Sequence, residues 1–193
     1  MNIFVLDKDI KLCAQHHCDK HLIKMITEHN QILASVKWKS QGITKKKQIT
    51  KEDTNKFTDF PRKNSDGTPN PYGIGFQYHP CTVWAGESID NYIWLCNLTL
   101  EMCKEYTKRY GKIHAGEEIV KWHKYNSPLL AIIGMTPFVQ AMPDDVKHKD
   151  PITAYRNYYK KYKVDFAKWI HTETPLWFKE IKIEKKTTNS LLV

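Results

Sequence analysis

The stretch that decides the fold is DKHLIKMITEHNQILASVKWKSQG, residues 19–42. Its apolar side chains recur at steps of three and four residues, a spacing that places them on one face of an α-helix. They are Leu22, Met25, Ile26, Ile32, Leu33 and Val36. Gly42 is a helix stop signal after the last of them. The stretch therefore predicts a long amphipathic helix with one face in a hydrophobic core.

Further helices are predicted by start and stop signals along the chain. Pro80 suits the first turn of a short helix, and Ser88 suits the N-cap of a long helix that Gly111 ends. Asp150 and the proline after it open the last long helix, which we expect to extend to about His171. Together with a helix predicted at residues 114–125, these helices span residues 79–88, 89–110 and 150–171.

The remaining segments lack helical periodicity. Residues 2–6 (NIFVL) are apolar and too short for an independent helix, so we expect an extended segment. Residues 43–77 are rich in charge, proline and glycine, which predicts a long basic loop of a kind that is usually functional or mobile. Residues 126–145 contain three prolines and a glycine and predict an ordered, partly buried connection. Residues 174–181 (TPLWFKEI) are expected to fold back through their aromatic side chains.

These signals predict an all-α protein with four to six helices. A chain of 193 residues suits a single domain, which we expect over residues 1–181, with a flexible basic tail at residues 182–193. There is no run of about 18 apolar residues and no secretion signal at the start, so we expect a cytoplasmic protein that does not enter a membrane. Five cysteines in a reducing compartment argue against a disulfide framework.

The charge of the chain points to a polyanionic partner. Thirty Lys and Arg residues against twenty-one Asp and Glu give a formal net charge of +9 and a pI near 9.2. Such a field attracts nucleic acid, which is the first partner to test. The alternative is a soluble protein that is merely basic.

One carboxylate stands among bases on the helix predicted from residue 19. His17, His21, Lys24, Glu28 and Gln31 are spaced by three or four residues, so we expect them on the face opposite the apolar one. The simplest interpretation is a solvated face on which Glu28 pairs with Lys24 at i,i+4. The alternative is a catalytic face centred on Glu28.

A zinc site is a third interpretation of the same region. His17 and His21 are four residues apart, and further nitrogen or sulfur ligands are available in Cys13, His16, Cys18, His79 and Cys81. The segment lacks the repeated CxxC or HExxH spacing of well-defined zinc motifs. Buried core residues are the more common role of isolated cysteines and histidines in apolar surroundings.

The last predicted helix carries two stripes. Its aromatic side chains are Tyr155, Tyr159, Tyr162, Phe166 and Trp169, and they are expected in the core. Its basic side chains, Arg156, Lys160 and Lys163, have a spacing that suits contacts with DNA phosphates, although a solubilising face is the alternative. Residues 104–112 and 45–47 are further basic clusters.

Taken together, these segments resemble the phage endonuclease V type of pyrimidine dimer DNA glycosylase. The segment DKHLIKMITE is similar to the family's Asp-x-His segment, in which the catalytic glutamate follows the histidine by seven residues, as Glu28 follows His21. His79 stands before the second long helix, Arg156 and Lys160 are four residues apart, and TPLWFK is similar to the family's closing segment. The similarity extends loosely over residues 1–180, with insertions mainly at residues 7–18 and 40–77.

The resemblance implies an activity and a set of site residues. Members of this family are small all-α enzymes that cut the N-glycosidic bond of a damaged pyrimidine and then nick the backbone as abasic-site lyases, without a metal or cofactor. It implies double-stranded DNA as the partner and Glu28 as a catalytic residue, and we expect a monomer. His21, Lys24, His79, Arg156 and Lys160 are the expected substrate-binding residues.

The nucleophile is where this chain departs from the family pattern. Family enzymes use the α-amine of a threonine exposed when the initiator methionine is removed. Residue 2 here is Asn2, which is too large for efficient methionine removal, and alignment of the first segment places Met1 where that threonine lies. An α-amino group has a pKa of about 7.7 to 8.0, so a neutral fraction is available near neutral pH. We therefore expect Met1 to supply the amine.

Three alternatives remain open at this stage. The segments HHCDKH, HPCTVW and MTPFVQAMPDD suggest a phage-type branch whose chemistry differs, such as an enzyme on the same scaffold that acts on hypermodified phage bases or on nucleotides. A non-catalytic DNA-binding phage protein is the second alternative. A zinc-stabilised version of any of these is the third. The sequence names neither the lesion nor the modified base.

Overall fold

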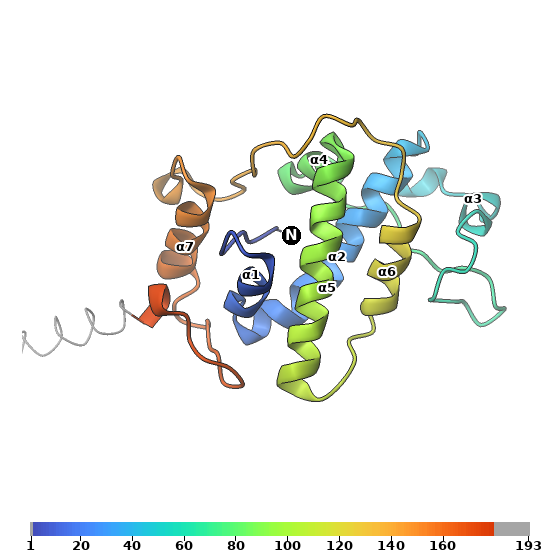
Figure 1. The fold of residues 1–193 in the computed structure, drawn as a ribbon. Coiled ribbons are helices and arrows are strands. Elements are labelled where there is room, and N and C mark those ends of the chain that lie inside the picture. Colours follow the sequence, from blue (N-terminus) through green and yellow to red (C-terminus); the bar gives the residue numbers. More distant parts are fainter. Residues whose placement is uncertain (1, 180–193) are drawn as a thin grey trace, which may run out of the picture.

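Helices α2 and α5 are the two elements on which α1, α4 and α6 pack. The computed structural model describes residues 2–179, and helices α4, α5 and α6 all contact α2, while α1 packs on α5. Figure 1 shows α7 beyond α1 at one side of this group and α3 beyond α6 at the other. The helices are α1 (Ile10–His16), α2 (Asp19–Ser40), α3 (Lys51–Asn55), α4 (Pro80–Glu87), α5 (Ile89–Tyr110), α6 (Glu117–Tyr125) and α7 (Pro151–Tyr162).

The rest of residues 2–179 contains little regular structure. Two short 3-10 helices lie at Lys46–Gln48 and Asp144–Val146, and a single antiparallel bridge joins Lys63 and Pro69. Residues 176–179 are helical. The described part of the chain holds no β-strand, so the all-α prediction is confirmed. The predicted tail at residues 182–193 lies outside the described residues.

The predicted helix boundaries are confirmed at most of their capping residues. The Ser88 hydroxyl accepts a hydrogen bond from the Asn91 amide at 3.1 Å and caps α5. Gly111 ends α5 with φ at 64°, a conformation that glycine adopts without strain. The Asp150 carboxylate accepts from the Thr153 amide at 3.0 Å and caps α7. Each cap satisfies backbone groups that a helix end leaves unpaired.

The number of helices and the end of α7 differ from the prediction. Helices α1 and α3 lie in the segments 7–18 and 43–77, where no helix was expected. Helix α7 ends at Tyr162 instead of about His171, because the chain after it turns to pair with the start of α2. There the Asp19 amide donates to the Lys168 carbonyl at 2.9 Å, and the Ile170 amide donates to the Asp19 carboxylate at 2.7 Å. Phe166 and Trp169 therefore lie beyond the helical stripe.

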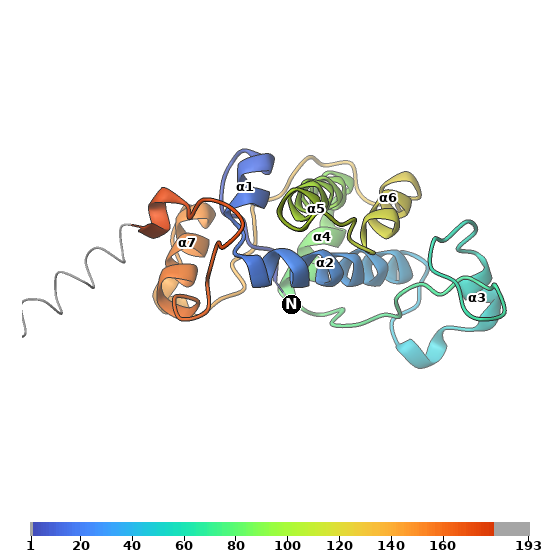
Figure 2. The same ribbon diagram turned by 90° about the horizontal axis from the view of Figure 1, so that it is seen from below.

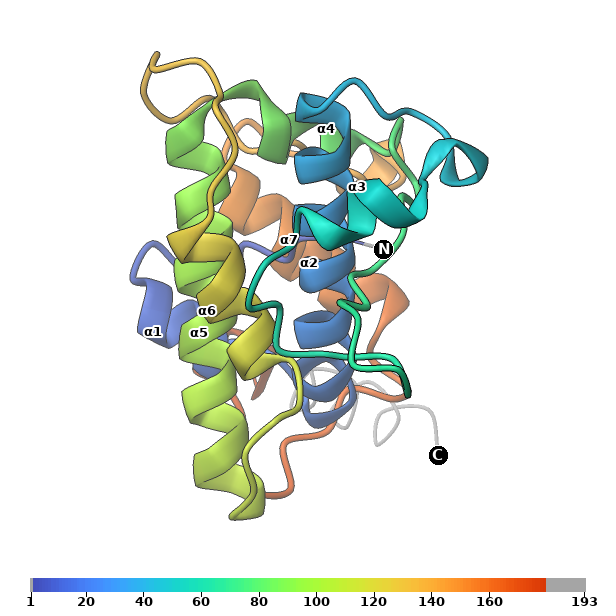
Figure 3. The ribbon, with the colours of Figure 1, turned by 90° about the vertical axis from the view of Figure 1, so that its right-hand side faces the viewer.

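Two hydrophobic clusters hold the chain together. The main core combines the apolar face of α2 with α4, α5, α7 and the buried segment of residues 3–6, which has no regular structure, as expected for an extended segment. A smaller cluster contains Trp38, Phe57, Phe60 and Trp122. It packs the segment of residues 43–77 against α2 and α6, as the view in Figure 3 shows. Ile43, Phe57, Phe60 and Ile74 therefore anchor that segment near its ends and its middle, although most of it lacks regular structure.

A buried ion network joins the C-terminal end of α5 to the corner between α1 and α2. The Arg109 guanidinium lies 2.9 Å from the Asp19 carboxylate and 2.8 Å from the Glu105 carboxylate. It also donates to the backbone carbonyls of Gln15 and His17 at 2.8 and 2.9 Å. Arg109 belongs to the basic cluster at residues 104–112, and its side chain is fully buried. It is therefore not available to DNA.

We predict that Arg109→Ala lowers the free energy of unfolding by about 3–5 kcal/mol, because it leaves two carboxylates buried without their cation. Urea denaturation followed by circular dichroism measures the change. Lys108→Ala is the matched control, since Lys108 is 68% exposed and lies 4.0 Å from Glu105, and it is expected to cost less than about 1 kcal/mol. Equal losses in the two variants would show that the network adds no stability.

Candidate active site

Glu28 and Lys24 form the predicted i,i+4 pair on α2. The Lys24 ammonium lies 3.0 Å from the Glu28 carboxylate. The Glu28 side chain is only 14% exposed, whereas that of Lys24 is 67% exposed. The carboxylate is thus largely enclosed at the protein surface, with a cation on its solvent side. This differs from a fully solvated helix face.

His79 lies within electrostatic reach of Glu28. It is the N-cap of α4, where its Nδ1 accepts a hydrogen bond from the Cys81 amide at 3.2 Å. Burial lowers the pKa of His79, and the charge of Glu28 acts in the opposite direction and raises it. The start of α4 and the middle of α2 therefore bring together two side chains that are 51 positions apart in the sequence.

Asn2 is anchored close to the same place. Its side-chain amide donates to the Ala141 carbonyl at 2.9 Å, and its side-chain oxygen accepts from the Tyr155 hydroxyl at 3.0 Å and from the Cys81 thiol at 3.4 Å. Burial lowers the pKa of His29 to about 3, while a hydrogen bond with the Asn2 backbone raises it. Asn2 thus lies against residues of α2, α4 and α7. Met1, the predicted nucleophile, lies outside the described residues.

His21 is a core residue and does not lie on the exposed face that its spacing predicted. Its ring stacks on Phe4 with centroids 4.5 Å apart, and its Nδ1 hydrogen-bonds the Tyr159 hydroxyl. Burial lowers the pKa of His21 to about 3, so the imidazole is neutral at physiological pH. A neutral, enclosed ring is poorly suited to holding a phosphate. The reason for the difference is tertiary, because the N-terminal segment and α7 cover this side of α2.

His16, His17 and Cys18 form the corner between α1 and α2. His16 is the last residue of α1, His17 is its C-cap, and Cys18 is the N-cap of α2. His17 is fully buried, its Nδ1 lies 2.8 Å from the Cys13 carbonyl, and burial lowers its pKa to about 4. The expectation that His17 belongs to the polar face of the α2 helix is therefore wrong.

The segment of residues 72–79 lies along α2 beside Glu28. The Trp38 indole donates to the Tyr72 carbonyl at 2.8 Å, and the Ser35 hydroxyl bonds both the carbonyl and the amide of Gly75, at 2.8 and 3.0 Å. Figure 2 shows the chain between α3 and α4 following α2 in this way. A pocket of about 190 Å³ opens between the segment and α2, and Gln31, one helical turn beyond Glu28, lines it.

A protein-family model matches the part of the chain that contains Glu28 and His79. The family model described as pyrimidine dimer DNA glycosylase matches residues 1–116, more than half of the sequence. The chain belongs to this family. Comparison with curated proteins and comparison with solved structures gave no match. Membership supports DNA glycosylase activity with DNA as the substrate.

The family match includes some of the predicted site residues and excludes others. His21, Lys24, Glu28 and His79 fall within residues 1–116 of this pyrimidine dimer DNA glycosylase family member, together with α1 to α5. The predicted DNA-binding residues of α7 fall after the matched region, so their role stays a prediction.

Among residues 2–179, no helix is long and apolar enough to span a membrane.

Arg156 and Lys160 have different surroundings on α7. The Arg156 guanidinium donates to the Leu6 carbonyl at 2.9 Å, lies 2.8 Å from the Asp7 carboxylate and lies over the Trp177 ring. It therefore fastens α7 to the N-terminal segment. Lys160 is partly exposed. Lys160 is thus the better placed of the two to contact a phosphate.

The thiols near the site are buried core groups. The Cys13 sulfur accepts from the Leu6 amide at 3.3 Å and lies 3.4 Å from the Phe4 carbonyl. Burial raises the pKa of Cys13 and of Cys81 to about 11. Within residues 2–179, no three His, Cys, Asp or Glu side chains are arranged to hold a metal ion. The zinc interpretation therefore has no ligand set in the described part of the chain.

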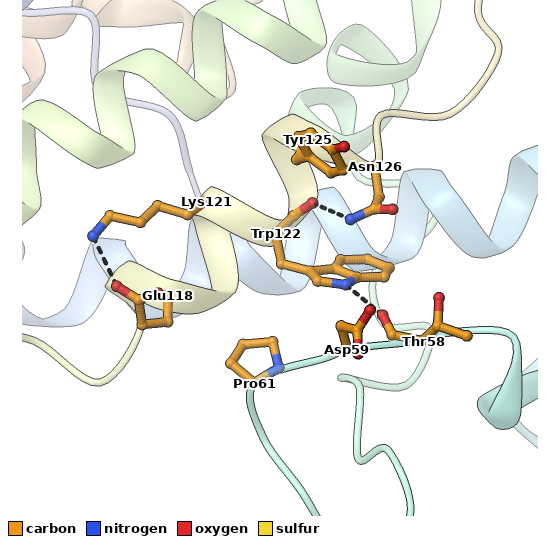
Figure 4. Close-up of a pocket in the computed structure, with 8 residues that line it drawn as sticks. All are labelled: Thr58, Asp59, Pro61, Glu118, Lys121, Trp122, Tyr125 and Asn126. Carbon is orange, nitrogen blue, oxygen red and sulfur yellow. Dashed lines mark hydrogen bonds and ion pairs between the residues drawn. The ribbon is translucent and has the colours of Figure 1, made fainter.

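A second pocket lies away from these residues. It has a volume of about 440 Å³ and opens between α6 and residues 58–61 (Figure 4). The Trp122 indole donates to the Thr58 carbonyl at 2.9 Å at its base, and the Lys121–Glu118 ion pair lies at its edge. None of the predicted site residues lines it. Its volume alone gives it no connection with the chemistry of the family.

Sequence reasoning missed two features of the site. The anchoring of Asn2 depends on partners at Cys81, Ala141 and Tyr155, which no local pattern joins. The sequence predicts the segment of residues 72–79 only as part of a loop. Its signal is in the letters YGIGFQYH, which contain two glycines and three aromatic residues immediately before α4.

The buried histidines predict a pH dependence of stability. Burial lowers the pKa of His17 to about 4 and those of His21, His29 and His123 to about 3, while an unfolded histidine titrates near 6.5. Below pH 6.5 the unfolded chain binds more protons, so the free energy of unfolding decreases as the pH falls toward 4. By pH 5.5 we expect a loss on the order of 1 kcal/mol for each histidine.

Urea unfolding at pH 7.5 and 5.5, together with NMR titration of the imidazoles, measures this effect. The four buried rings are expected to stay neutral across this range in the folded protein. Titration of His21 near pH 6.5 would contradict its placement in the core.

Proposed function

We propose that this protein is a DNA glycosylase with abasic-site lyase activity on damaged or modified pyrimidines. The observation that carries the proposal is the enclosed Glu28 carboxylate, which lies in the family-matched region and within electrostatic reach of His79. Its sequence neighbour His29 contacts the anchored Asn2. A carboxylate in such a position suits proton transfer at a reacting sugar.

The proposed nucleophile is the α-amine of Met1. The support is that Asn2, the residue covalently joined to Met1, has a fixed position beside α2 and α4. Residue 2 is also too large for efficient removal of the initiator methionine. A retained Met1 would offer its amine without special activation.

The proposed reaction proceeds through a Schiff base. The amine forms a bond to C1′ of the deoxynucleotide while the glycosidic bond breaks, and the bonding pair leaves with the base, which takes up a proton. Loss of the amine proton and opening of the sugar ring give the imine. Glu28 stabilises the cationic intermediates and accepts the C2′ proton, so that C2′=C3′ forms and the 3′ phosphate leaves. Water then hydrolyses the imine and regenerates the amine.

The DNA must be opened before this reaction, because C1′ is not accessible inside a duplex. Base flipping costs a few kcal/mol and is least expensive at a damaged base, which gives part of the selectivity. The net charge of +9 supplies general attraction to the phosphates. Lys24 at the rim of the Glu28 site and Lys160 on α7 are the proposed phosphate contacts. His79 is proposed to orient the substrate next to Glu28.

The chemistry is tested by borohydride trapping on DNA that carries an abasic site. The wild-type protein is expected to give a covalent adduct, because borohydride reduces the imine to a stable amine. Glu28→Gln is expected to lower turnover by about 10²- to 10⁴-fold while DNA affinity is retained. Glu101→Gln is the matched control, since Glu101 also pairs with an exposed lysine on a helix, at 2.6 Å from Lys104. It is expected to change neither property.

Absence of a trapped adduct with the wild-type protein, while a known lyase gives one in parallel, would refute amine catalysis. Equal losses of turnover and affinity in Glu28→Gln would assign Glu28 a structural role. Intact mass measurement determines whether Met1 is retained, and acetylation of the N-terminus is expected to abolish trapping.

The phosphate contact is tested by the salt dependence of binding. We predict that Lys160→Ala weakens DNA binding and lowers the slope of log K against log salt by about one unit. Lys121→Ala, on α6, serves as the control, because Lys121 pairs with Glu117 and Glu118 and lies outside the basic clusters. It is expected to leave the slope unchanged. Arg156→Ala should instead lower the melting temperature, because Arg156 bonds Leu6 and Asp7. An unchanged slope in Lys160→Ala would remove α7 from the DNA interface.

A further inference from the structure

Two aromatic side chains project into solvent from the segment of residues 72–79, which lies along α2. Phe76 is 68% exposed and Tyr78 is 77% exposed. Single exposed apolar residues are common on protein surfaces. These two are unusual because only one residue separates them, and because hydrogen bonds fix the backbone of their segment at both ends and in the middle.

The backbone around Phe76 and Tyr78 is fixed by hydrogen bonds. Gly75 is bonded twice to Ser35, and the His79 amide donates to the Phe76 carbonyl at 2.9 Å. Phe76 itself has φ at 51°, in the left-handed region that costs a residue with a side chain about 1–2 kcal/mol. The surrounding bonds hold a conformation that keeps the ring exposed. Strain of this kind accumulates at functional sites.

The segment leads directly to Glu28. Its contacts approach Glu28 step by step along α2. Tyr72 contacts Trp38, and Gly75 contacts Ser35. Phe76 then lines one pocket together with Gln31. The segment ends at His79, whose pKa responds to the charge of Glu28. Residues 28 and 35 are about 10 Å apart along a helix. The two exposed rings therefore lie on the same side of α2 as the Glu28 site and close to it.

We propose that Phe76 and Tyr78 form an aromatic wedge that stacks on DNA bases beside the lesion and holds the duplex open during the reaction at Glu28. The proposal rests on the proposed function, because it requires that DNA be opened at this site. Every base has a flat π-face, so stacking on exposed rings is tolerant of sequence. Aromatic and apolar wedges inserted between base steps unstack them and kink the duplex. Lys46, which lines the same pocket as Phe76, provides a cation for the adjacent DNA backbone.

The wedge is tested on duplexes that carry a single thymine dimer or a tetrahydrofuran abasic analogue, with 2-aminopurine next to the lesion. Wild-type protein is expected to increase the 2-aminopurine fluorescence, because the base becomes unstacked. Phe76→Ala with Tyr78→Ala should abolish the increase and weaken lesion binding by about five- to a hundredfold per ring. Tyr125→Ala is the matched control, since Tyr125 is 91% exposed on α6, and it should behave as wild type.

Two further variants separate the ring from the backbone. Phe76→Gly removes the ring and tolerates the positive φ, so it should keep or raise the melting temperature yet lose the fluorescence signal. Phe76→Trp keeps a stacking surface and should retain the signal. An unchanged signal in the double variant, or no signal with wild-type protein, would overturn the wedge. Failure of the lyase chemistry is distinguishable, because trapping would then be absent while the Phe76-dependent fluorescence persists.

Discussion

The buried Arg109 network is the interaction on which the arrangement of the helices depends. One guanidinium joins the end of α5 to Asp19 at the start of α2 and to the carbonyls that end α1. The second oxygen of Asp19 also binds the chain after α7 through the Ile170 amide. Four parts of the sequence thus meet at one charge pair. The direction of α2, and with it the position of Glu28 against α4, follows from this junction.

Much of the fold could be predicted from local patterns. The apolar periodicity of residues 19–40 and the capping residues Ser88, Gly111 and Asp150 act within a few positions of the chain, so they specified α2, α5 and the start of α7. The end of α7 could not be predicted, because helical periodicity continues in the sequence beyond Tyr162. There the chain leaves the helix to bind Asp19, a partner about 150 positions away.

The site was predictable only in part, for a related reason. The Lys24–Glu28 ion pair is an i,i+4 contact within one helix, and helical spacing predicts it correctly. His21 and Arg109 resemble surface residues in the sequence, yet segments distant in the chain bury them. Helical spacing defines two faces but does not say which neighbours cover each face. The proximity of His79 and Asn2 to α2 likewise arises from tertiary packing alone.

The small aromatic cluster of Trp38, Phe57, Phe60 and Trp122 gives the segment between α2 and α4 a core of its own. Because it buries fewer apolar side chains than the main core, we expect this satellite core to open at a lower free energy and to exchange its amide hydrogens sooner. The chain bearing Phe76 is attached to this cluster through Trp38 and Tyr72. The proposed aromatic wedge would thus loosen before the helical body unfolds, so this segment and helix α2 would have separate melting temperatures.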